Sequence, residues 1–243
     1  MNTAASPLLQ RLRKPTEQEL SGISWWHALR PEHRSYAQEH LLVGSAFTGE
    51  LVCRLGSAPT YWMGLLSGLL KMTNDTTQHS RTIIFAGLAP GGWFGEGTLL
   101  KREPYRYNLR VLRDSLIAVL PVDAFHWLLE HSIEFNRVLM RQLNERVGQF
   151  IAARELERMT NQDIRVARTL AALFNPVLFP SEQNTLHITQ QELAQLVKLS
   201  RQRVNEALRV LESHGAIRVV YGGLVVQDLD MLRHGDFVRA DKA

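Results

Sequence analysis

The sequence predicts an α+β fold with an N-terminal antiparallel β-barrel or jelly roll, a long dimerisation helix and a C-terminal winged helix-turn-helix. Three stretches predict it. Residues 188–212 read as two short helices separated by a tight break, residues 46–121 as short strands between turn residues, and residues 132–159 as one long helix. The expected domains are residues 1–121, 122–159 and 160–243.

The helix pair is the most specific of these stretches. Thr189 is placed to cap the first helix, which runs to Val197, and Glu192 stands at the spacing of a capping box. Ser200 follows a short break and is placed to cap a second helix. Two short helices joined in this way are typical of a helix-turn-helix, which binds DNA.

The second helix is expected from about Arg201 to Ser213, with Val204, Leu208 and Leu211 facing inward. Its outward side chains are of the kinds that reach base edges and phosphates in a major groove. The candidate DNA-binding residues, the two caps included, are Thr189, Ser200, Arg201, Gln202, Arg203, Asn205, Glu206 and Arg209.

Composition excludes several classes of protein. The net charge is +4, but basic and acidic residues are nearly equal in number from residue 160 on, so overall charge decides little. The single cysteine, Cys53, excludes an internal disulfide and a cluster held by several thiolates, and we expect it to be a small buried residue. No secretory signal and no apolar run of about 18 residues is present, which predicts a cytoplasmic protein without a membrane partner.

The N-terminal half begins with a loose segment to about residue 20. One or two short helices are expected next, with Trp25, Trp26, Leu29 and Tyr36 at amphipathic spacing and Pro31 between them. His27, His33 and His40 lie nearby, but no pair of carboxylates has matching ligand spacing, so no metal site is predicted.

Short strands at roughly ten-residue spacing follow, which is typical of a small antiparallel barrel or jelly roll. The turn Ala89–Gly92 is one of the breaks between them. The candidate strands are Glu50–Leu55, Tyr61–Ser67, Gly68–Thr73, Thr82–Leu88, Tyr107–Val111 and Ser115–Leu120. The aromatic residues expected to pack the core are Trp62, Phe85, Trp93 and Phe94.

Strand patterning stops after Pro121. Asp123 is placed to cap a short helix over 124–130, and the long helix follows from Ser132 to about Met159. Apolar residues recur along it in alternating steps of three and four, which is typical of a coiled-coil seam. The expected interface residues are Ile133, Met140, Leu143, Val147 and Phe150. Either they form a parallel dimer axis, which we favour, or they pack on the barrel of the same chain.

The C-terminal part opens with Thr160 or Asn161 as a new cap, before a helix over 162–174. A short strand over 186–188 leads into the helix pair. Beyond it, Ile217–Val220 and Leu224–Val226 are expected to form a hairpin through Tyr221-Gly222-Gly223. A hairpin directly after the second helix is a wing, and a short helix and polar tail follow from 228.

This order of parts resembles the CRP/FNR family of bacterial transcription regulators, over nearly the whole chain. The most specific match is TQQELAQLVKLSRQRVNEALRVLESHGAI, residues 189–217. The resemblance implies that Arg201, Gln202 and Glu206 read bases, with Arg201 suited to guanine and Glu206 to the amine of cytosine. The family often has Glu at the place of Gln202 and Arg at that of Glu206, so a different operator is expected.

The resemblance also implies an effector cassette. Gly95-Glu96 is followed ten residues after the glutamate by Arg106, the family's spacing for ribose and cyclic-phosphate contacts. Tyr107 departs from the pattern, because a small hydroxyl residue is usual there. The candidate effector residues are therefore Gly95, Glu96, Arg106 and Tyr107. Three alternatives remain: a cyclic nucleotide, another small anionic or apolar effector, or no effector, with Glu96 and Arg106 simply paired to each other.

The functional hypothesis is a homodimeric regulator that binds double-stranded DNA at a palindromic operator, with RNA polymerase as an implied partner. The alternative is a small-molecule-binding module that acts through protein contacts without specific DNA binding. An enzyme is not expected, because no nucleophile–base pair or metal cluster has the required spacing.

Overall fold

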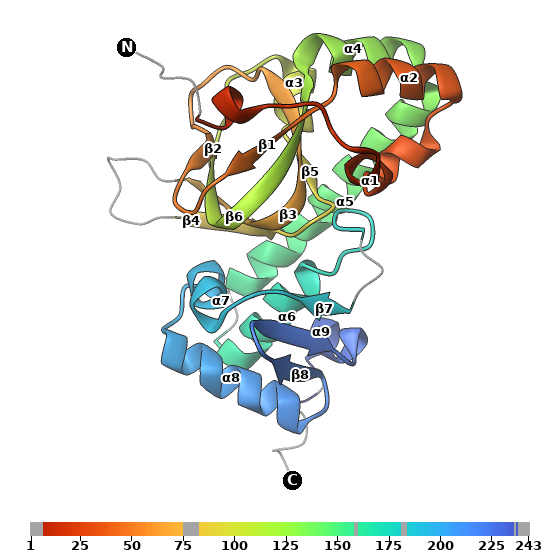
Figure 1. Cartoon of the computed structure of the whole chain (residues 1–243). Coiled ribbons are helices and arrows are strands. Elements are labelled where there is room, and N and C mark those ends of the chain that lie inside the picture. Colours follow the sequence, from red (N-terminus) through yellow and green to blue (C-terminus); the bar gives the residue numbers. More distant parts are fainter. Residues whose placement is uncertain (1–6, 75–82, 158–159, 181–183, 236, 238–243) are drawn as a thin grey trace. The chain divides into compact units, whose positions relative to one another are not determined.

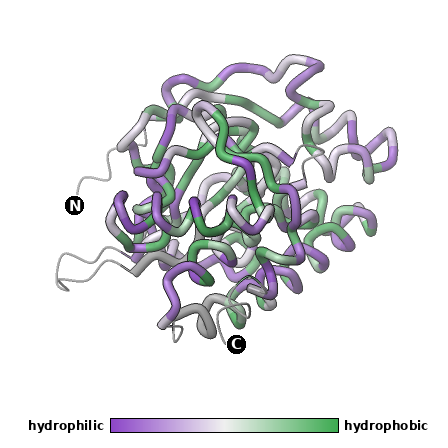
Figure 2. The backbone as a smooth tube through the Cα atoms, turned by 90° about the horizontal axis from the view of Figure 1, so that it is seen from below, coloured by the Kyte–Doolittle hydropathy of each residue, from purple (hydrophilic) through white to green (hydrophobic). Residues whose placement is uncertain are grey.

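The computed structural model describes residues 7–74, 83–157, 160–180, 184–235 and 237. The chain divides into two compact units, of which the first comprises residues 1–147 and 177–180 and the second residues 148–176 and 181–243. Each is described by itself. Figure 1 shows the order of helices and strands along the chain, and along the coils of Figure 2 hydrophilic and hydrophobic residues alternate, as expected of helices that bury one face.

The first unit begins with short helices. Thr16 forms a capping box with Glu19 at the start of α1, and Pro31 occupies the first turn of α2, where its missing N–H costs nothing. This confirms the short helices expected on either side of Pro31. Their bounds are η1 Pro7–Arg11, α1 Glu17–Ser21, η2 Ser24–Ala28 and α2 Pro31–His40.

The sheet of this unit is antiparallel throughout and six-stranded, with the order β1-β6-β3-β4 and with β2 paired to β6 and β5 to β3. The strands are β1 Leu42–Ala46, β2 Leu51–Cys53, β3 Tyr61–Asn74, β4 Ile83–Leu88, β5 Trp93–Phe94 and β6 Asn108–Pro121. The antiparallel N-terminal β domain is therefore confirmed. Strand β1 was not expected, and Thr82 lies outside the described residues.

Two expected strand breaks are wrong. Residues 61–74 form one strand, and so do residues 108–121. The pairing of β3 with β6 shifts register on both sides of Gly68, which has φ +105°, and a Cβ there would lie 2.1 Å from the Ser115 hydroxyl oxygen. Gly68 therefore bends a continuous strand at a bulge, because only glycine fits this close approach and this backbone angle.

The core of the first unit is aromatic. The rings of Trp62 and Trp93 lie 4.3 Å apart between centroids, and Trp25 from the N-terminal helices lies 5.2 Å from Trp93. Phe135 packs edge-on to Trp62 at 5.3 Å. Trp62, Trp93 and Phe94 are buried, which confirms the packing role expected of them. The side chain of Phe85 lies outside the described residues.

The sheet is followed by α4 Val122–His131 and α5 Ile133–Glu157, and residues 148–157 of α5 belong to the second unit. The short α3 Glu96–Lys101 lies between β5 and β6. Asp123 is not the cap of α4. The helix begins at Val122 with Pro121 as its N-cap, and the Val122 N–H donates to the Thr60 carbonyl instead. The final residue of β6 is thus also the cap of the helix, which leaves Asp123 in the first turn.

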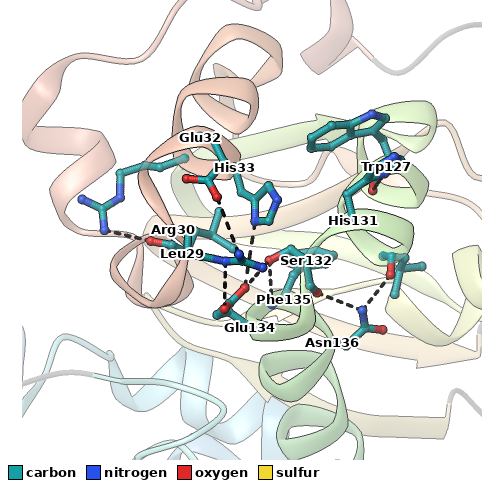
Figure 3. A network of polar contacts seen from close by, with 12 residues as sticks. Leu29, Arg30, Glu32, His33, Trp127, His131, Ser132, Glu134, Phe135 and Asn136 are labelled. Atoms are coloured by element: carbon teal, nitrogen blue, oxygen red, sulfur yellow. Dashed lines mark hydrogen bonds and ion pairs between the residues drawn. The ribbon is translucent and has the colours of Figure 1, made fainter.

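Polar contacts join α2 to the start of α5 (Figure 3). Arg30 Nε lies 3.1 Å from one carboxylate oxygen of Glu134, and Ser132 Oγ donates to the other at 3.0 Å. The buried His33 has its Nδ1 3.9 Å from the same carboxylate. A backbone hydrogen bond first, and then the Ser132 hydroxyl and the Arg30 guanidinium, lower the pKa of Glu134. Within the described residues, no group of histidine, cysteine and acidic side chains is arranged to hold a metal ion.

The second unit is a small α+β domain, and its helices and strands closely follow the expected ranges. They are α6 Gln162–Ala172, β7 Thr185–Leu186, α7 Gln190–Val197, α8 Arg201–Ser213, β8 Ile217–Val220, β9 Gly223–Val226 and α9 Leu229–His234. The three strands form one antiparallel sheet in the order β7-β9-β8. Asn161, one of the two expected caps, accepts hydrogen bonds from the Asp163 and Ile164 amides at the start of α6.

Candidate nucleic-acid interface and effector cassette

Side-chain caps define the helix pair α7–α8. The Thr189 hydroxyl accepts from the Glu192 N–H at 3.2 Å, and the Glu192 carboxylate accepts from the Thr189 N–H at 2.6 Å. The Ser200 hydroxyl accepts from the Arg203 N–H at 3.1 Å. Lys198 ends α7 in the left-handed conformation with φ 55°. The capping box and the second cap are therefore confirmed, and in this structure Thr189 and Ser200 satisfy helix ends.

Helix α8 separates an inner face from an outer one. Val204, Leu208 and Leu211 are buried in the unit's core, as expected, together with Ala207. Four of the expected DNA-binding side chains are exposed. These are Arg201, Gln202, Glu206 and Arg209. Among the described residues, Arg201 and Arg209 have no side-chain hydrogen bond or ion pair, and Gln202 only reaches Glu206 at 3.4 Å. This face is available to a ligand.

Two further candidates are already engaged within the unit. The Arg203 guanidinium pairs with the Asp163 carboxylate at 2.6 Å and donates to Gln162 at 2.7 Å, so it ties α8 to α6. The Asn205 side-chain oxygen accepts from Gln190 at 3.0 Å, which ties α8 to α7. Sequence reasoning grouped these residues with the exposed ones because periodicity says which way a side chain points and not what it meets.

A hollow of about 430 Å³ lies between the N-terminal ends of α7 and α8 and the hairpin β8–β9. Thr189, Gln190, Gln191 and Arg201 line its helical side. Its other residues are Ile188, Leu193, Leu208, Val219, Val220, Gly222, Gly223 and Leu224. Gln190 and Gln191 were not among the residues expected to bind DNA. Their position directly after the Thr189 cap could have indicated them, because backbone N–H groups are free in the first turn of a helix.

In the first unit, Gly95 and Glu96 begin α3. Gly95 is the N-cap with φ 94°, a conformation that favours glycine. Glu96 is 2% exposed and accepts from Arg146 Nε of α5 at 2.5 Å. Arg146 also donates to the Trp93 carbonyl, and Gln142, one turn earlier on α5, donates to the same carbonyl at 2.7 Å. The glutamate of the cassette is therefore held by the long helix.

Arg106 lies elsewhere. It is exposed and pairs with Glu103 at 2.8 Å on the surface. The alternative in which Glu96 and Arg106 pair with each other is thus wrong, because each has another partner. Sequence reasoning missed Arg146, since a partner 50 residues away on another helix leaves no local signal.

Tyr107 is half-buried, whereas the neighbouring Arg106 is exposed. Its ring lies 5.7 Å from that of Tyr105, which is buried and donates to the Tyr61 carbonyl at 3.3 Å. Burial raises the pKa of Tyr105 and of Tyr107, and that of the buried thiol of Cys53, so all three are neutral. Cys53 is thus the small buried residue expected.

Two family models match this chain. The cyclic nucleotide-binding domain matches residues 46–132, and the Crp-like helix-turn-helix domain matches residues 164–234. The chain belongs to the CRP/FNR family of transcription regulators. It is a DNA-binding regulator with an N-terminal domain of the cyclic nucleotide-binding type. The members of this family are transcription regulators and not enzymes.

Solved CRP/FNR structures share this fold. FixK2 from Bradyrhizobium japonicum is 15% identical with a TM-score of 0.61, over 78% of this chain and 94% of that one. The c-di-GMP responsive global regulator CLP from Xanthomonas campestris is 21% identical with a TM-score of 0.54, over 81% and 99%. A CRP/FNR regulator from Thermus thermophilus is 22% identical with a TM-score of 0.52, over 82% and 98%. A search of curated proteins gives no match.

The long helix of this CRP/FNR regulator carries an exposed apolar stripe. The exposed fraction is 57% for Ile133, 61% for Met140, 58% for Val147 and 47% for Phe150, whereas Leu143 is half-buried. Packing on the chain's own β domain, the other interpretation of the stripe, does not cover Ile133, Met140 or Val147. Dimerisation stays a prediction.

Among the helices of the described residues, none combines the length and the apolar character that a membrane span requires.

Proposed function

We propose that this CRP/FNR regulator acts as a homodimer that binds a palindromic operator through two copies of α8. The observation that carries the proposal is the division of α8 into a buried apolar face and an exposed face bearing Arg201, Gln202 and Glu206. We place its action in the cytoplasm, with RNA polymerase at the promoter as its further partner.

The chemistry of the exposed face suits base edges. A guanidinium such as that of Arg201 bonds O6 and N7 of guanine together, and a carboxylate such as that of Glu206 accepts from the N4 amine of cytosine. Gln202 suits adenine or guanine. Arg209, two turns along the same helix, suits a phosphate. Arg203 and Asn205 support this face by fixing α8 against α6 and α7.

The apolar stripe on α5 supports the dimer. Apolar side chains left in water along a helix are stabilised when a second copy covers them in a coiled coil. A two-fold dimer also places two recognition helices on half-sites about 34 Å apart, which is one turn of DNA. The expected operator is therefore a palindrome.

The oligomeric state tests this part directly. Met140→Asp and Val147→Asp each place a charge on the stripe, and light scattering should show that both variants are monomers. Arg141→Asp, which changes an exposed residue on the same helix but off the stripe, should stay dimeric. A wild-type protein that is monomeric at micromolar concentration would contradict the dimer.

DNA recognition is tested by selecting duplexes from a random library and measuring affinity by mobility shift. Arg201→Ala should lower the affinity for the selected duplex by about 5- to 100-fold and relax the preference at one position of each half-site. Arg233→Ala in α9 removes an exposed arginine of equal charge and should have no such effect. The alternative module without specific DNA binding predicts no selected sequence and unchanged transcription from a reporter in cells carrying Arg201→Ala.

We further propose that the effector is not a cyclic nucleotide. Arg106 pairs on the surface, Glu96 is bound to Arg146, and Tyr107 stands where a small hydroxyl would meet a phosphate. A cyclic nucleotide would have to draw Arg106 away from Glu103 to reach its phosphate and would meet Tyr107 in place of a small hydroxyl. A small apolar ligand, or none, requires neither change.

Isothermal titration tests the effector proposal. We expect no heat with cyclic AMP, cyclic GMP or c-di-GMP, the last chosen because the Xanthomonas protein of similar fold responds to it. Binding of any of these that disappears in Arg106→Ala would overturn the proposal and would make this a nucleotide-gated regulator.

A further inference from the structure

A second hollow, of about 540 Å³, lies in the first unit between α3, α4 and the loop that precedes β3. Figure 1 shows α3 and α4 at the same end of the sheet. The volume falls within the range of about 300–1,000 Å³ that is typical of small-molecule sites. Neither Glu96 nor Arg106 is among the described residues that line the hollow, so it is separate from the effector cassette.

Helix α4 forms one wall of the hollow and gives it negative charge. Asp123, His126, Trp127 and Glu130 stand at helical spacing, so they share one side of the helix. Both carboxylates are exposed, and neither has a side-chain hydrogen bond or ion pair within the part of the chain that the structure describes. This wall therefore attracts a positively charged group.

The end of α3 brings a cation to the same hollow. Arg102 is exposed, and its guanidinium has no hydrogen bond or ion pair among the described residues. Its backbone is left-handed, with φ 54°, a conformation that glycine adopts without strain. An arginine at a position that favours glycine points to a role for its side chain. The hollow thus offers unpaired groups of both charges.

Apolar side chains form much of the remaining lining. The ring of Trp127 stacks with that of Tyr36 at 3.8 Å and with that of His131 at 4.3 Å between centroids, so the half-buried indole is held in one place. Leu99 and Pro59 line the hollow beside it. A fixed indole among apolar groups favours an aromatic ligand, because rings pack well in offset or edge-on contact.

His126 adds a buried polar atom to the α4 wall. Its Nε2 is buried and has no hydrogen-bond partner among the residues that the structure describes. A buried polar atom without a partner lowers stability, and a hydrogen bond with a ligand removes that cost. His126 therefore favours a ligand with polar groups close to its apolar part.

We propose that this hollow binds a free aromatic amino acid. The α-ammonium group pairs with the carboxylates of α4, the α-carboxylate pairs with Arg102, and the ring packs on Trp127 and Leu99. A ligand with one charge would leave either the carboxylates or the guanidinium unpaired. Because α3 begins at Glu96 of the cassette and ends beside the hollow, the amino acid is an effector read outside the cassette.

A series of ligands tests the three parts of this recognition. In isothermal titration of the wild-type protein, L-tryptophan and L-phenylalanine should bind and L-alanine should not, because it has no ring. Tryptamine lacks the carboxylate and indole-3-propionate lacks the ammonium group. Each should bind roughly three- to tenfold more weakly than L-tryptophan, since each loses one charge-assisted contact.

Variants of the two walls assign these contacts. Arg102→Ala should weaken the binding of L-tryptophan by the same factor and leave that of tryptamine unchanged. The double variant Asp123→Asn/Glu130→Gln should weaken the binding of L-tryptophan and not that of indole-3-propionate. Lys101→Ala is the matched control, because Lys101 is an exposed cation next to Arg102 that does not line the hollow.

Four results would overturn the inference. They are the absence of binding heat with L-tryptophan and L-phenylalanine at millimolar concentration, L-alanine binding as tightly as L-tryptophan, an equal loss in Lys101→Ala and Arg102→Ala, and binding that disappears in Arg106→Ala, which would place the ligand in the cassette. The titrations contain no DNA, so their outcome is independent of the proposed operator binding.

Discussion

Helix α8 was predicted from its caps and apolar spacing and the effector cassette from the family resemblance, and their charged residues stand differently in the structure. On α8, Arg201 and Arg209 are exposed and bind no other side chain among the described residues. In the cassette, Glu96 is bound to Arg146 of α5 and Arg106 to Glu103. The charged side chains on the face proposed to bind DNA are thus free for a ligand, whereas those of the cassette are paired within the chain.

The largest expected effect concerns the buried ion pair of the cassette. Arg146→Ala leaves the Glu96 carboxylate buried without its partner, which should cost about 3–5 kcal/mol of unfolding free energy. Urea denaturation checks this value. The double variant Glu96→Gln/Arg146→Ala removes the stranded charge and should recover a large part of the loss. If Arg146→Ala were as stable as the wild type, the ion pair with Arg146 would not be what stabilises the buried Glu96 carboxylate.

A smaller effect is expected on the outer face of α8. Glu206→Gln keeps the shape of the side chain but removes the carboxylate that suits a cytosine amine, so discrimination at one position of each half-site should fall by about 1–3 kcal/mol. Competition with single-base variants of the selected duplex measures it. The unfolding free energy should not change, since Glu206 is exposed. An unchanged preference at every position would remove Glu206 from the reading face.

A third effect separates two neighbouring arginines. Arg203→Ala breaks the contacts with Asp163 and Gln162, and because these side chains are partly exposed the cost should be only about 1 kcal/mol of stability. Arg201→Ala should cost no stability. Thermal denaturation of both variants, beside their DNA affinities, sharpens the distinction. Equal stability losses would show that the contacts of Arg203 with Asp163 and Gln162 do not stabilise the unit.

The smallest effect is expected at Arg106. Its pair with Glu103 is at the surface, where such pairs contribute about 0–1 kcal/mol, so Arg106→Ala should unfold at the same temperature within error. Operator affinity without effector should also stay the same. A clear loss of either would mean that Arg106 acts inside the domain rather than at its surface.

Much of the fold was predictable because local rules decide it. The capping residues Thr189 and Ser200, the apolar spacing of α8 and the glycine turn of the hairpin each act within a few residues, and each was found as expected. The exposed face of α8 follows from the same periodicity. The expected breaks in β3 and β6 were wrong. Gly68 reads as a turn residue in the sequence, but in the structure it forms a bulge within a strand that stays paired.

The sequence by itself determined the order of the parts, the two capped helices and the face that α8 presents, because these depend on neighbours three or four residues apart. Only the tertiary structure decided the partners of the charged groups. Arg146 reaches Glu96 across 50 residues, Arg203 reaches Asp163 across 40, and the hairpin is fixed to Glu212 by a single carboxylate. Such contacts form where the fold brings together groups from different elements, and no periodicity along the sequence records that meeting.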